Sequence, residues 1–329
     1  MGNIFLGPLK ADDYKKIKYN HYNFVTSGIF VSSGANALRL LIRSLNLKKK
    51  SRIAIPALIC SSVARAIKLE KKTPAFTDIS SDNYFMLFQK KNFDKEKYNL
   101  IVLPHMYGIL HPQTEEIINY AKENNIPLIH DCAQSYGVLY EGRPIVEFNE
   151  GGFYSFGAGK STTAASGGLV FGIKKELIEK YNLFSFKKKD LFSENFLKER
   201  CGLNYFKYFY YFLSKRFQAS QLQVNAASYV LNNYEKIEKR RKINFNKLKN
   251  ILPEDIYEAK KLKRFSYYKY IFYSKHKLFI EKEYPYLPVR TVYFPERNSD
   301  SIQNYNKFNG FLYEVSTERS FEEYKEINS

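Results

Sequence analysis

The sequence lacks tryptophan, has only three cysteines and contains no long apolar run. Cys60, Cys132 and Cys201 lie far apart without CxxC spacing, which argues against a disulfide framework and against a structural zinc site. No run approaches the roughly 18 to 20 apolar residues of a membrane-spanning helix, and the first residues turn charged before a signal-peptide core can form. We therefore expect reduced thiols, no metal site, no membrane span and a cytoplasmic location.

Acidic residues are scarce relative to basic ones, with 33 Asp and Glu against 52 Lys and Arg and a formal charge of +19. The lysines are scattered, with short clusters at 48–50, 187–189 and 239–242, and no nucleic-acid-binding module accompanies them. We therefore expect no nucleic-acid partner. A positive field also attracts small anionic substrates such as sugar nucleotides or dicarboxylates.

The 329 residues are 44% apolar and 17% aromatic, which excludes wholesale disorder and suits one large or two modest domains. Between residues 30 and 172, short β-branched runs alternate with helical stretches. The predicted strands are Arg52–Ile55, Ala75–Asp78, Leu100–Pro104, Pro127–Asp131, Gly152–Phe156 and Gly168–Phe171, and the predicted helices are Ala35–Leu45, Ser61–Leu69 and Thr114–Asn124. This alternation predicts an α/β domain with a mostly parallel sheet sandwiched by helices.

Beyond this region, Gln221–Leu248 reads as one long helix followed by a Tyr-rich segment. We predict a large α/β domain at residues 1–222 and a smaller C-terminal α+β domain at 223–329. Residues 204–217 are both aromatic and basic. They fit a membrane-surface helix or a buried helix or subunit contact, and the second is favoured because no clean charged face opposes the rings.

A small-residue turn, Ser32-Ser33-Gly34-Ala35, runs into the first predicted helix. Backbone N–H groups at a helix N-terminus bind anions such as phosphate, although Ser-Gly before a helix is also an ordinary N-cap.

One predicted strand ends in an acid, within Ile129-His130-Asp131-Cys132-Ala133-Gln134. Ligands of such sheets lie at the carboxyl ends of strands. A carboxylate there can pair with the ring nitrogen of pyridoxal phosphate (PLP) and keep it protonated. An Asp that caps the next helix gives the same pattern.

A lysine follows another predicted strand, in Tyr154-Ser155-Phe156-Gly157-Ala158-Gly159-Lys160, with Gly167-Gly168 after it. Small neighbours leave the Lys160 amine open to a carbonyl carbon, which suits a Schiff base. By itself an exposed loop lysine is the alternative. The following Ser161 also suggests a P-loop, but that motif needs a glycine at position 154, which is Tyr.

The loop Pro104-His105-Met106-Tyr107-Gly108 follows a further strand, and its polar rings could face the same crevice. Because single histidines are mostly structural, we assign His105 no catalytic role. Tyr107 is kept as a candidate phosphate- or substrate-binding residue.

Taken together, these four motifs resemble the sugar aminotransferases of the DegT/DnrJ/EryC1/StrS family, in order and spacing over residues 30–172 and more loosely over 218–231. The resemblance implies a fold-type I PLP-dependent transferase that is normally a dimer with active sites shared at the subunit interface. It also implies the reaction, which moves an amino group, usually from glutamate, to the keto sugar of a nucleotide sugar for polysaccharide or glycan synthesis.

The same resemblance implies roles for individual residues. Lys160 would bond the cofactor and move protons, Asp131 would pair with the pyridine nitrogen, and Gln134 would bind the ring hydroxyl. Ser155 and the backbone at Gly34 and Ala35 would hold the phosphate. Arg216 aligns with an Asn that reaches the partner's phosphate, and it can replace that Asn because a guanidinium donates several hydrogen bonds to phosphate.

Several positions depart from the family pattern: Ala35 replaces a threonine, and Cys60 replaces an aromatic that stacks on the cofactor ring. Two alternatives therefore remain. One is a PLP enzyme with a different small carbonyl substrate. The other is a degenerate, non-enzymatic homologue with a binding or regulatory role. Dehydratase relatives replace the lysine with histidine, so Lys160 argues against that branch.

Overall fold

The computed structural model describes residues 28–93, 96–164, 166–183, 216–253, 266–275, 290–292, 302–306 and 310–317. Cys201, the lysine cluster 187–189 and residues 204–215 of the aromatic and basic segment lie outside the described residues. Within the described ranges, no helix combines the length and the apolar character that crossing a bilayer requires.

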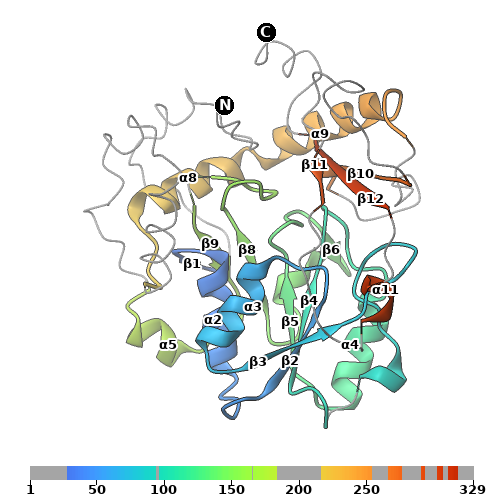
Figure 1. Cartoon of the computed structure of the whole chain (residues 1–329). Helices are drawn as coiled ribbons and strands as arrows, with labels where there is room; N and C mark the ends of the chain where they lie inside the picture. Colours follow the sequence, from blue (N-terminus) through green and yellow to red (C-terminus); the bar gives the residue numbers. More distant parts are fainter. Residues whose placement is uncertain are drawn as a thin grey trace, which may run out of the picture.

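A seven-stranded sheet with the order β1-β9-β8-β5-β4-β2-β3 forms the centre of the protein (Figure 1). Its strands are β1 (Ile29–Val31), β2 (Arg52–Pro56), β3 (Thr73–Thr77), β4 (Leu100–Pro104), β5 (Leu128–Asp131), β8 (Gly152–Ser155) and β9 (Gly168–Val170). The pairs among β3, β2, β4, β5 and β8 are parallel, and β9 runs antiparallel to both of its neighbours. The predicted mostly parallel sheet is confirmed.

Helices cover both faces of this sheet because its buried strands are apolar on both sides. In β2, Ile53 and Ile55 pack in one core cluster with α2 (Gly34–Ser44) and α3 (Ser61–Leu69). Ala54, between them, belongs to the opposite cluster, which includes α4 (Thr114–Glu123). This two-residue alternation of side chains is what a strand between two helix layers requires.

The predicted boundaries within residues 30–172 agree with the structure to within two residues, and Leu100–Pro104 and Ser61–Leu69 match it throughout. The structure adds β1, which at three residues is too short to recognise from a pattern. It also adds a small hairpin and short helices. These are β6 (Leu139–Tyr140), β7 (Arg143–Pro144), α5 (Lys175–Lys180) and the 3-10 turns Lys90–Asn92 and Ile145–Glu147.

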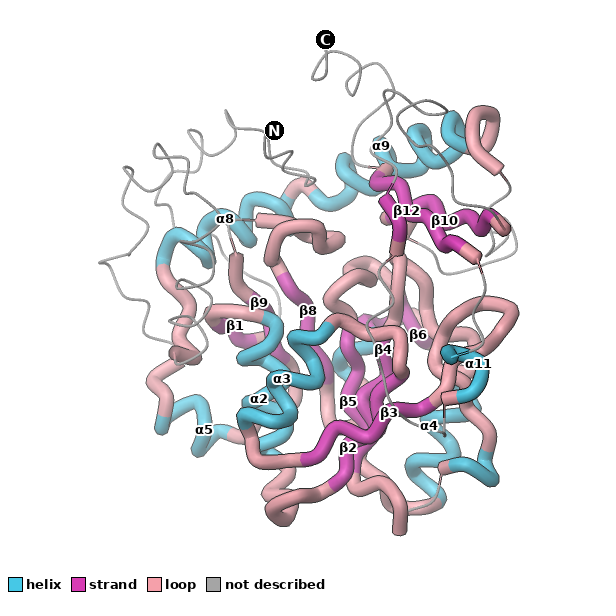
Figure 2. The backbone as a smooth tube through the Cα atoms, in the orientation of Figure 1, coloured by secondary structure: helices cyan, strands magenta, loops and turns pink. Residues whose placement is uncertain are grey.

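The single long helix predicted over Gln221–Leu248 is wrong, because the structure has two helices there (Figure 2). α8 (Gln221–Asn232) starts with a capping box between Ser220 and Gln223 and ends at Asn233, where α9 (Tyr234–Leu248) begins. The Asn233 side chain donates to the Tyr229 carbonyl at 2.8 Å. Such a local side-chain bond competes with helix continuation, which explains the break.

The domain boundary predicted at residue 222 falls inside α8 and stays a prediction. α8 packs Ala226, Ala227 and Val230 into the core cluster that contains Phe30 and Tyr154 of the large sheet. α9 continues from it toward the small sheet (Figure 1).

A small antiparallel sheet follows, with the order β10-β12-β11. Its elements are β10 (Lys269–Ser274), β11 (Arg290–Thr291) and β12 (Phe311–Ser316), with α11 (Gln303–Asn306) before β12. Ile271 and Leu312 of this sheet pack with Met106 and Tyr107 of the loop after β4. The small sheet is therefore anchored next to the carboxyl ends of the central strands.

Candidate active site

The predicted site residues meet at one edge of the large sheet. Pro104 pairs with Asp131, and Asp131 pairs with Phe153, so the carboxyl ends of β4, β5 and β8 are aligned. The turn into α2 reaches the same edge, because Ser33 forms a bridge with Gly167 beside the start of β9. The sheet thus gathers residues that are far apart in the sequence.

Asp131 is buried at the end of β5, with 6% of its surface exposed. Its Oδ1 accepts a hydrogen bond from the Ala133 N–H at 3.0 Å, and Oδ2 accepts none from the described residues. Burial raises the pKa of Asp131, whereas the Ala133 N–H and the positive charge of Lys160 lower it. Asp131 is therefore a buried carboxylate with one oxygen left for a cationic partner.

A short loop fixes the backbone of Lys160. Its N–H donates to Thr163 Oγ1 at 2.8 Å, and the Thr163 hydroxyl reaches the carbonyls of Gly157 and Lys160. The hydroxyl of Tyr268, the residue before β10, donates to the Gly159 carbonyl. The Lys160 side chain makes no ion pair or hydrogen bond with the described residues. Its charge nevertheless acts on the Asp131 carboxyl, so the structure brings the two predicted residues into one electrostatic environment.

The turn before α2 lies directly against Ser155. A Cβ on Gly34 would lie 2.7 Å from Ser155 Cβ and 2.9 Å from its Oγ, so only glycine fits there. Ser33 Oγ accepts from the Asn36 N–H at 3.1 Å, while the Ala35 N–H has no acceptor among the described residues. A helix N-terminus with an open N–H beside a serine hydroxyl is suited to binding a phosphate.

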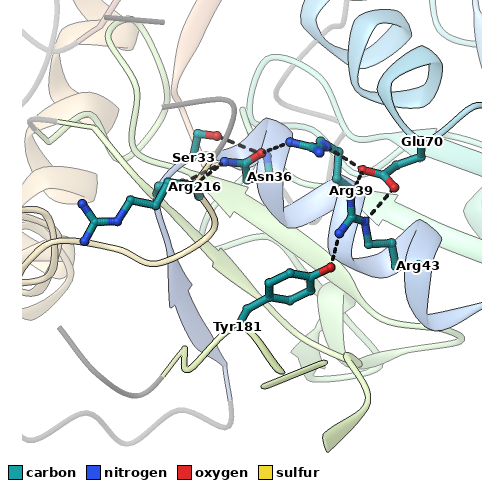
Figure 3. Close-up of polar contacts among 8 residues, drawn as sticks. Ser33, Asn36, Arg39, Arg43, Glu70, Tyr181 and Arg216 are labelled. Atoms are coloured by element: carbon teal, nitrogen blue, oxygen red, sulfur yellow. Dashed lines mark hydrogen bonds and ion pairs between the residues drawn. The ribbon is translucent and has the colours of Figure 1, made fainter. Parts of the chain in front are cut away.

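Arg216 touches this turn through its backbone. Its carbonyl accepts hydrogen bonds from the Ser32 hydroxyl and from Asn36 Nδ2. The side chain extends away from α2 in Figure 3, and its buried Nη2 has no partner among the described residues. The Arg216 backbone thus helps to hold the turn, and its guanidinium points elsewhere.

A partly buried network of ion pairs and hydrogen bonds supports the turn before α2 (Figure 3). Arg39 donates to Asn36 Oδ1 at 2.9 Å and to Glu70 at 2.6 Å, and Arg43 donates to the other Glu70 oxygen at 2.6 Å. Both guanidinium groups lie over the Phe217 ring, at 4.7 and 4.8 Å from its centre. The network links α2, α3 and the residue after Arg216, which stiffens the turn.

Gln134 is held by the loop after β4. Its Oε1 accepts from the Tyr107 N–H at 3.1 Å, which leaves its Nε2 as a donor without a partner among the described residues. Tyr107 and Gly108 have φ values of +59° and +86°, and a Cβ on Gly108 would lie 2.5 Å from Ser266 Oγ. The Tyr107 ring is buried, and burial raises the pKa of its hydroxyl.

Three buried histidines lie beneath the site, and each of their ring nitrogens has a partner. The Nδ1 atoms of His105 and His111 accept from backbone N–H groups, so both protons sit on Nε2. His105 Nε2 then donates to His130 Nδ1, and His130 Nε2 donates to Asn149 Oδ1. Burial lowers the pKa of each, to about 4 for His111 and His130. These residues are neutral and fully bonded, and the absence of a catalytic role for His105 stays a prediction.

The sequence analysis did not identify two residues from the C-terminal part of the chain that hold the Lys160 loop. The hydroxyl of Tyr268 and the guanidinium of Arg241 donate to the carbonyls of Gly159 and Ser161. They lie after the matched motifs, where neither spacing nor pattern marked them. Cys60, which the family resemblance predicts to replace an aromatic residue, is exposed at the N-cap of α3.

Comparisons with known proteins agree with this geometry. The profile of the DegT/DnrJ/EryC1/StrS aminotransferase family matches residues 17–253. GDP-perosamine synthase of Escherichia coli O157:H7 is 31% identical over 50% of this chain and 45% of its own length. A UDP-4-amino-4,6-dideoxy-N-acetyl-beta-L-altrosamine transaminase of Campylobacter jejuni is 26% identical over 61% of this chain and 54% of its own.

These matches cover part of each relative, and the chain spans about half the length of the curated relatives it matches. Among solved structures, E. coli GDP-4-keto-6-deoxy-D-mannose-3-dehydratase with bound hydrated PLP has a TM-score of 0.65 and 17% identity, over 97% of this chain and 90% of its own. This likeness shows the fold of a PLP-dependent transferase. Because the family profile covers most of the sequence, the chain belongs to the DegT/DnrJ/EryC1/StrS aminotransferase family.

Proposed function

We propose that the protein is a PLP-dependent aminotransferase that moves an amino group from an amino acid, glutamate, to the keto sugar of a nucleotide sugar. The observation that carries the proposal is a buried Asp131, whose Oδ2 lacks a partner among the described residues, within the electrostatic reach of Lys160. Family membership and the names of the relatives, which include a GDP-sugar synthase and a UDP-sugar transaminase, support the substrate class.

The open polar groups match the chemical groups of the cofactor. Asp131 Oδ2 would accept from the protonated ring nitrogen, and Gln134 Nε2 would donate to the ring hydroxyl. Ser155 Oγ and the Ala35 N–H would hold the phosphate, in a space that Gly34 keeps open. Acceptor, donor and anion cradle are each of the right kind, so the residues fit PLP.

When bound, PLP supplies an electron sink that withdraws electrons from the reacting carbon. Asp131 keeps the ring nitrogen protonated, which maintains that sink. Lys160 Nζ would hold the cofactor at its aldehyde carbon and, once the substrate amine had displaced it, would move a proton to and from the reacting carbon of the substrate. Overall, the amino acid exchanges its amino group and α-hydrogen for the carbonyl oxygen of the keto sugar.

A homodimer with shared sites is part of the same proposal. The Arg216 guanidinium turns away from its own phosphate turn and has a buried Nη2 without a partner among the described residues. Such a group suits a contact with the phosphate in a second copy of the chain. Light scattering during size-exclusion chromatography would measure the dimer. We also propose a cytoplasmic location, where glutamate and nucleotide sugars are both available.

The test combines cofactor binding with turnover. Purified protein given PLP is expected to develop the visible absorbance of the lysine-bound cofactor, and L-glutamate is expected to bleach it. A panel of keto nucleotide sugars, read by mass, should then yield one or more products in which the carbonyl has become an amine. A different productive carbonyl compound would change the substrate class. Absence of bound cofactor would contradict the proposal and favour a non-enzymatic homologue.

A further inference from the structure

The small sheet brings a second lysine to the site. Lys269 is the first residue of β10, and its Nζ lies 2.5 Å from Glu314 Oε1 on β12. The two side chains are 10% and 21% exposed, so the pair is largely buried without being sealed from solvent. Glu314 therefore holds Lys269 while a small part of both side chains stays exposed to solvent.

Two contacts tie Lys269 to the loop of Lys160. The hydroxyl of Tyr268 donates to the Gly159 carbonyl, and Lys269 Nζ lies 5.3 Å from the centre of the Tyr268 ring. Burial lowers the pKa of Lys269, Glu314 raises it, and the charge of Lys160 lowers it. Lys269 therefore lies close enough to Lys160 for the charge of Lys160 to act on it.

The chemistry of the two proposed substrates differs at this point. In an amino donor, the α-carboxylate is bonded directly to the carbon whose amino group is exchanged at Lys160. In a nucleotide sugar, ring atoms separate the reacting carbon from the phosphates. A cation beside Lys160 is therefore placed for the carboxylate of the donor rather than for the diphosphate of the acceptor.

We propose that Lys269 binds the α-carboxylate of the amino donor and that Glu314 takes over as the partner of Lys269 when the uncharged sugar ring occupies the site. This inference rests on the proposed function. A buried ammonium without a partner is costly. The amino donor offers Lys269 a carboxylate, whereas the sugar ring of the acceptor offers it no negative group. Glu314 meets that requirement by pairing with Lys269 whenever the carboxylate is absent.

The experiment uses the holoenzyme and follows the loss of cofactor absorbance with increasing L-glutamate, without a keto sugar. Lys269→Met is expected to raise the half-saturating glutamate concentration roughly 10- to 100-fold, as loss of a charged hydrogen bond does, with little change in the rate at saturation. Lys269→Arg is expected to recover most of the affinity. Glu314→Gln is expected to lower the half-saturating concentration, because it removes the competing carboxylate.

A second readout does not depend on turnover. Binding of maleate, a dicarboxylate that has no amino group to exchange, is measured by calorimetry on the same holoenzymes. It should weaken in Lys269→Met and strengthen in Glu314→Gln. Lys175→Met removes an exposed lysine on α5, whose side chain is 84% exposed, and serves as the matched control. Cofactor occupancy and thermal midpoint are recorded for every variant.

The outcomes separate the inference from the proposed function. If wild-type holoenzyme exchanges with glutamate and Lys269→Met does so with unchanged affinity, the inference alone is overturned. The same holds if Glu314→Gln weakens maleate and glutamate as Lys269→Met does, because that result indicates an ion pair that only stabilises the fold. If the wild-type protein binds no cofactor or exchanges with no amino donor, the proposed function fails and the inference fails with it.

Discussion

Three buried histidines and one buried aspartate lie at or near the ends of β4 and β5, and they differ in how many of their hydrogen-bonding atoms have a partner. His105, His111 and His130 have a partner for every ring nitrogen. Asp131, next in sequence to His130, uses one oxygen and leaves the other open among the described residues. Burial favours the neutral form of all four residues, because it lowers the pKa of the three histidines and raises the pKa of Asp131.

The difference separates structure from chemistry. A fully bonded buried group has no bonding capacity left for a ligand, so the histidines connect the strand ends to the loops around them. An open buried carboxylate oxygen is costly in the protein alone and gains most from a cationic ligand. Burial by itself would not have distinguished these residues, whereas the count of remaining bonds does.

The largest expected effect comes from Lys160, whose charge acts on the open Asp131 carboxylate. Lys160→Ala should lower amino transfer by about 10²- to 10⁴-fold, because it removes the positioned proton carrier. Rates of product formation measure the effect, and Lys175→Ala, on the exposed face of α5, is the control. Turnover of Lys160→Ala at the wild-type rate would place the chemistry elsewhere.

The lowered pKa values of the three histidines lead us to expect that the protein becomes less stable in acid. Their pKa values in the folded protein lie below the ordinary value of 6.5, at about 4 for His111 and His130. Between these values the unfolded chain binds protons that the folded chain does not, so stability falls as pH falls, by about 3 kcal/mol for each of the two residues. Urea unfolding between pH 7 and pH 4 measures this loss.

His111→Gln sharpens the result, since the amide can still donate to the Met86 carbonyl but does not titrate. As pH falls, the unfolding free energy of this variant should decrease less steeply than that of the wild-type protein. The difference in slope should correspond to at most one proton bound on unfolding. An unchanged slope would show that His111 is not neutral in the folded state.

Asp131 predicts the opposite pH dependence. Because burial raises its pKa, the folded chain keeps this proton at pH values where the unfolded chain has released it, and this contribution to stability is lost as pH rises. Asp131→Asn should therefore leave the cofactor-free protein as stable as before or more so. It should also weaken cofactor affinity roughly 10- to 100-fold, as expected for the loss of a charged hydrogen bond. Equal affinity in the variant would mean that Oδ2 does not meet the ring nitrogen.

The smallest expected effect concerns the loop that supports Lys160. Thr163→Val removes the hydroxyl that bonds to the Lys160 N–H and to the Gly157 carbonyl. We expect a loss of about 1 kcal/mol in unfolding free energy and a moderate fall in turnover from a less ordered lysine. Thr162, whose hydroxyl makes a longer bond of 3.4 Å to the Ser155 carbonyl, offers the matched control Thr162→Val.

Much of the large sheet could be predicted because its strands and helices alternate with strong periodicity. Asp131 ends a buried strand, Gln134 and Lys160 lie in the segments after buried strands, and parallel strands bring such positions to one edge. The break at Asn233 could not be predicted, since it depends on one side-chain bond within an otherwise helical pattern. Lys269 and Glu314 could not be found either, because their pairing depends on the register of two strands separated by more than thirty residues.

The most direct test asks which lysine bonds the cofactor. Protein incubated with PLP is treated with borohydride, digested, and its peptides are weighed by mass spectrometry. We predict the added mass of the reduced cofactor on the peptide that contains Lys160, and its loss from that peptide in Lys160→Ala. A label on another lysine, or no label at all, would contradict the account.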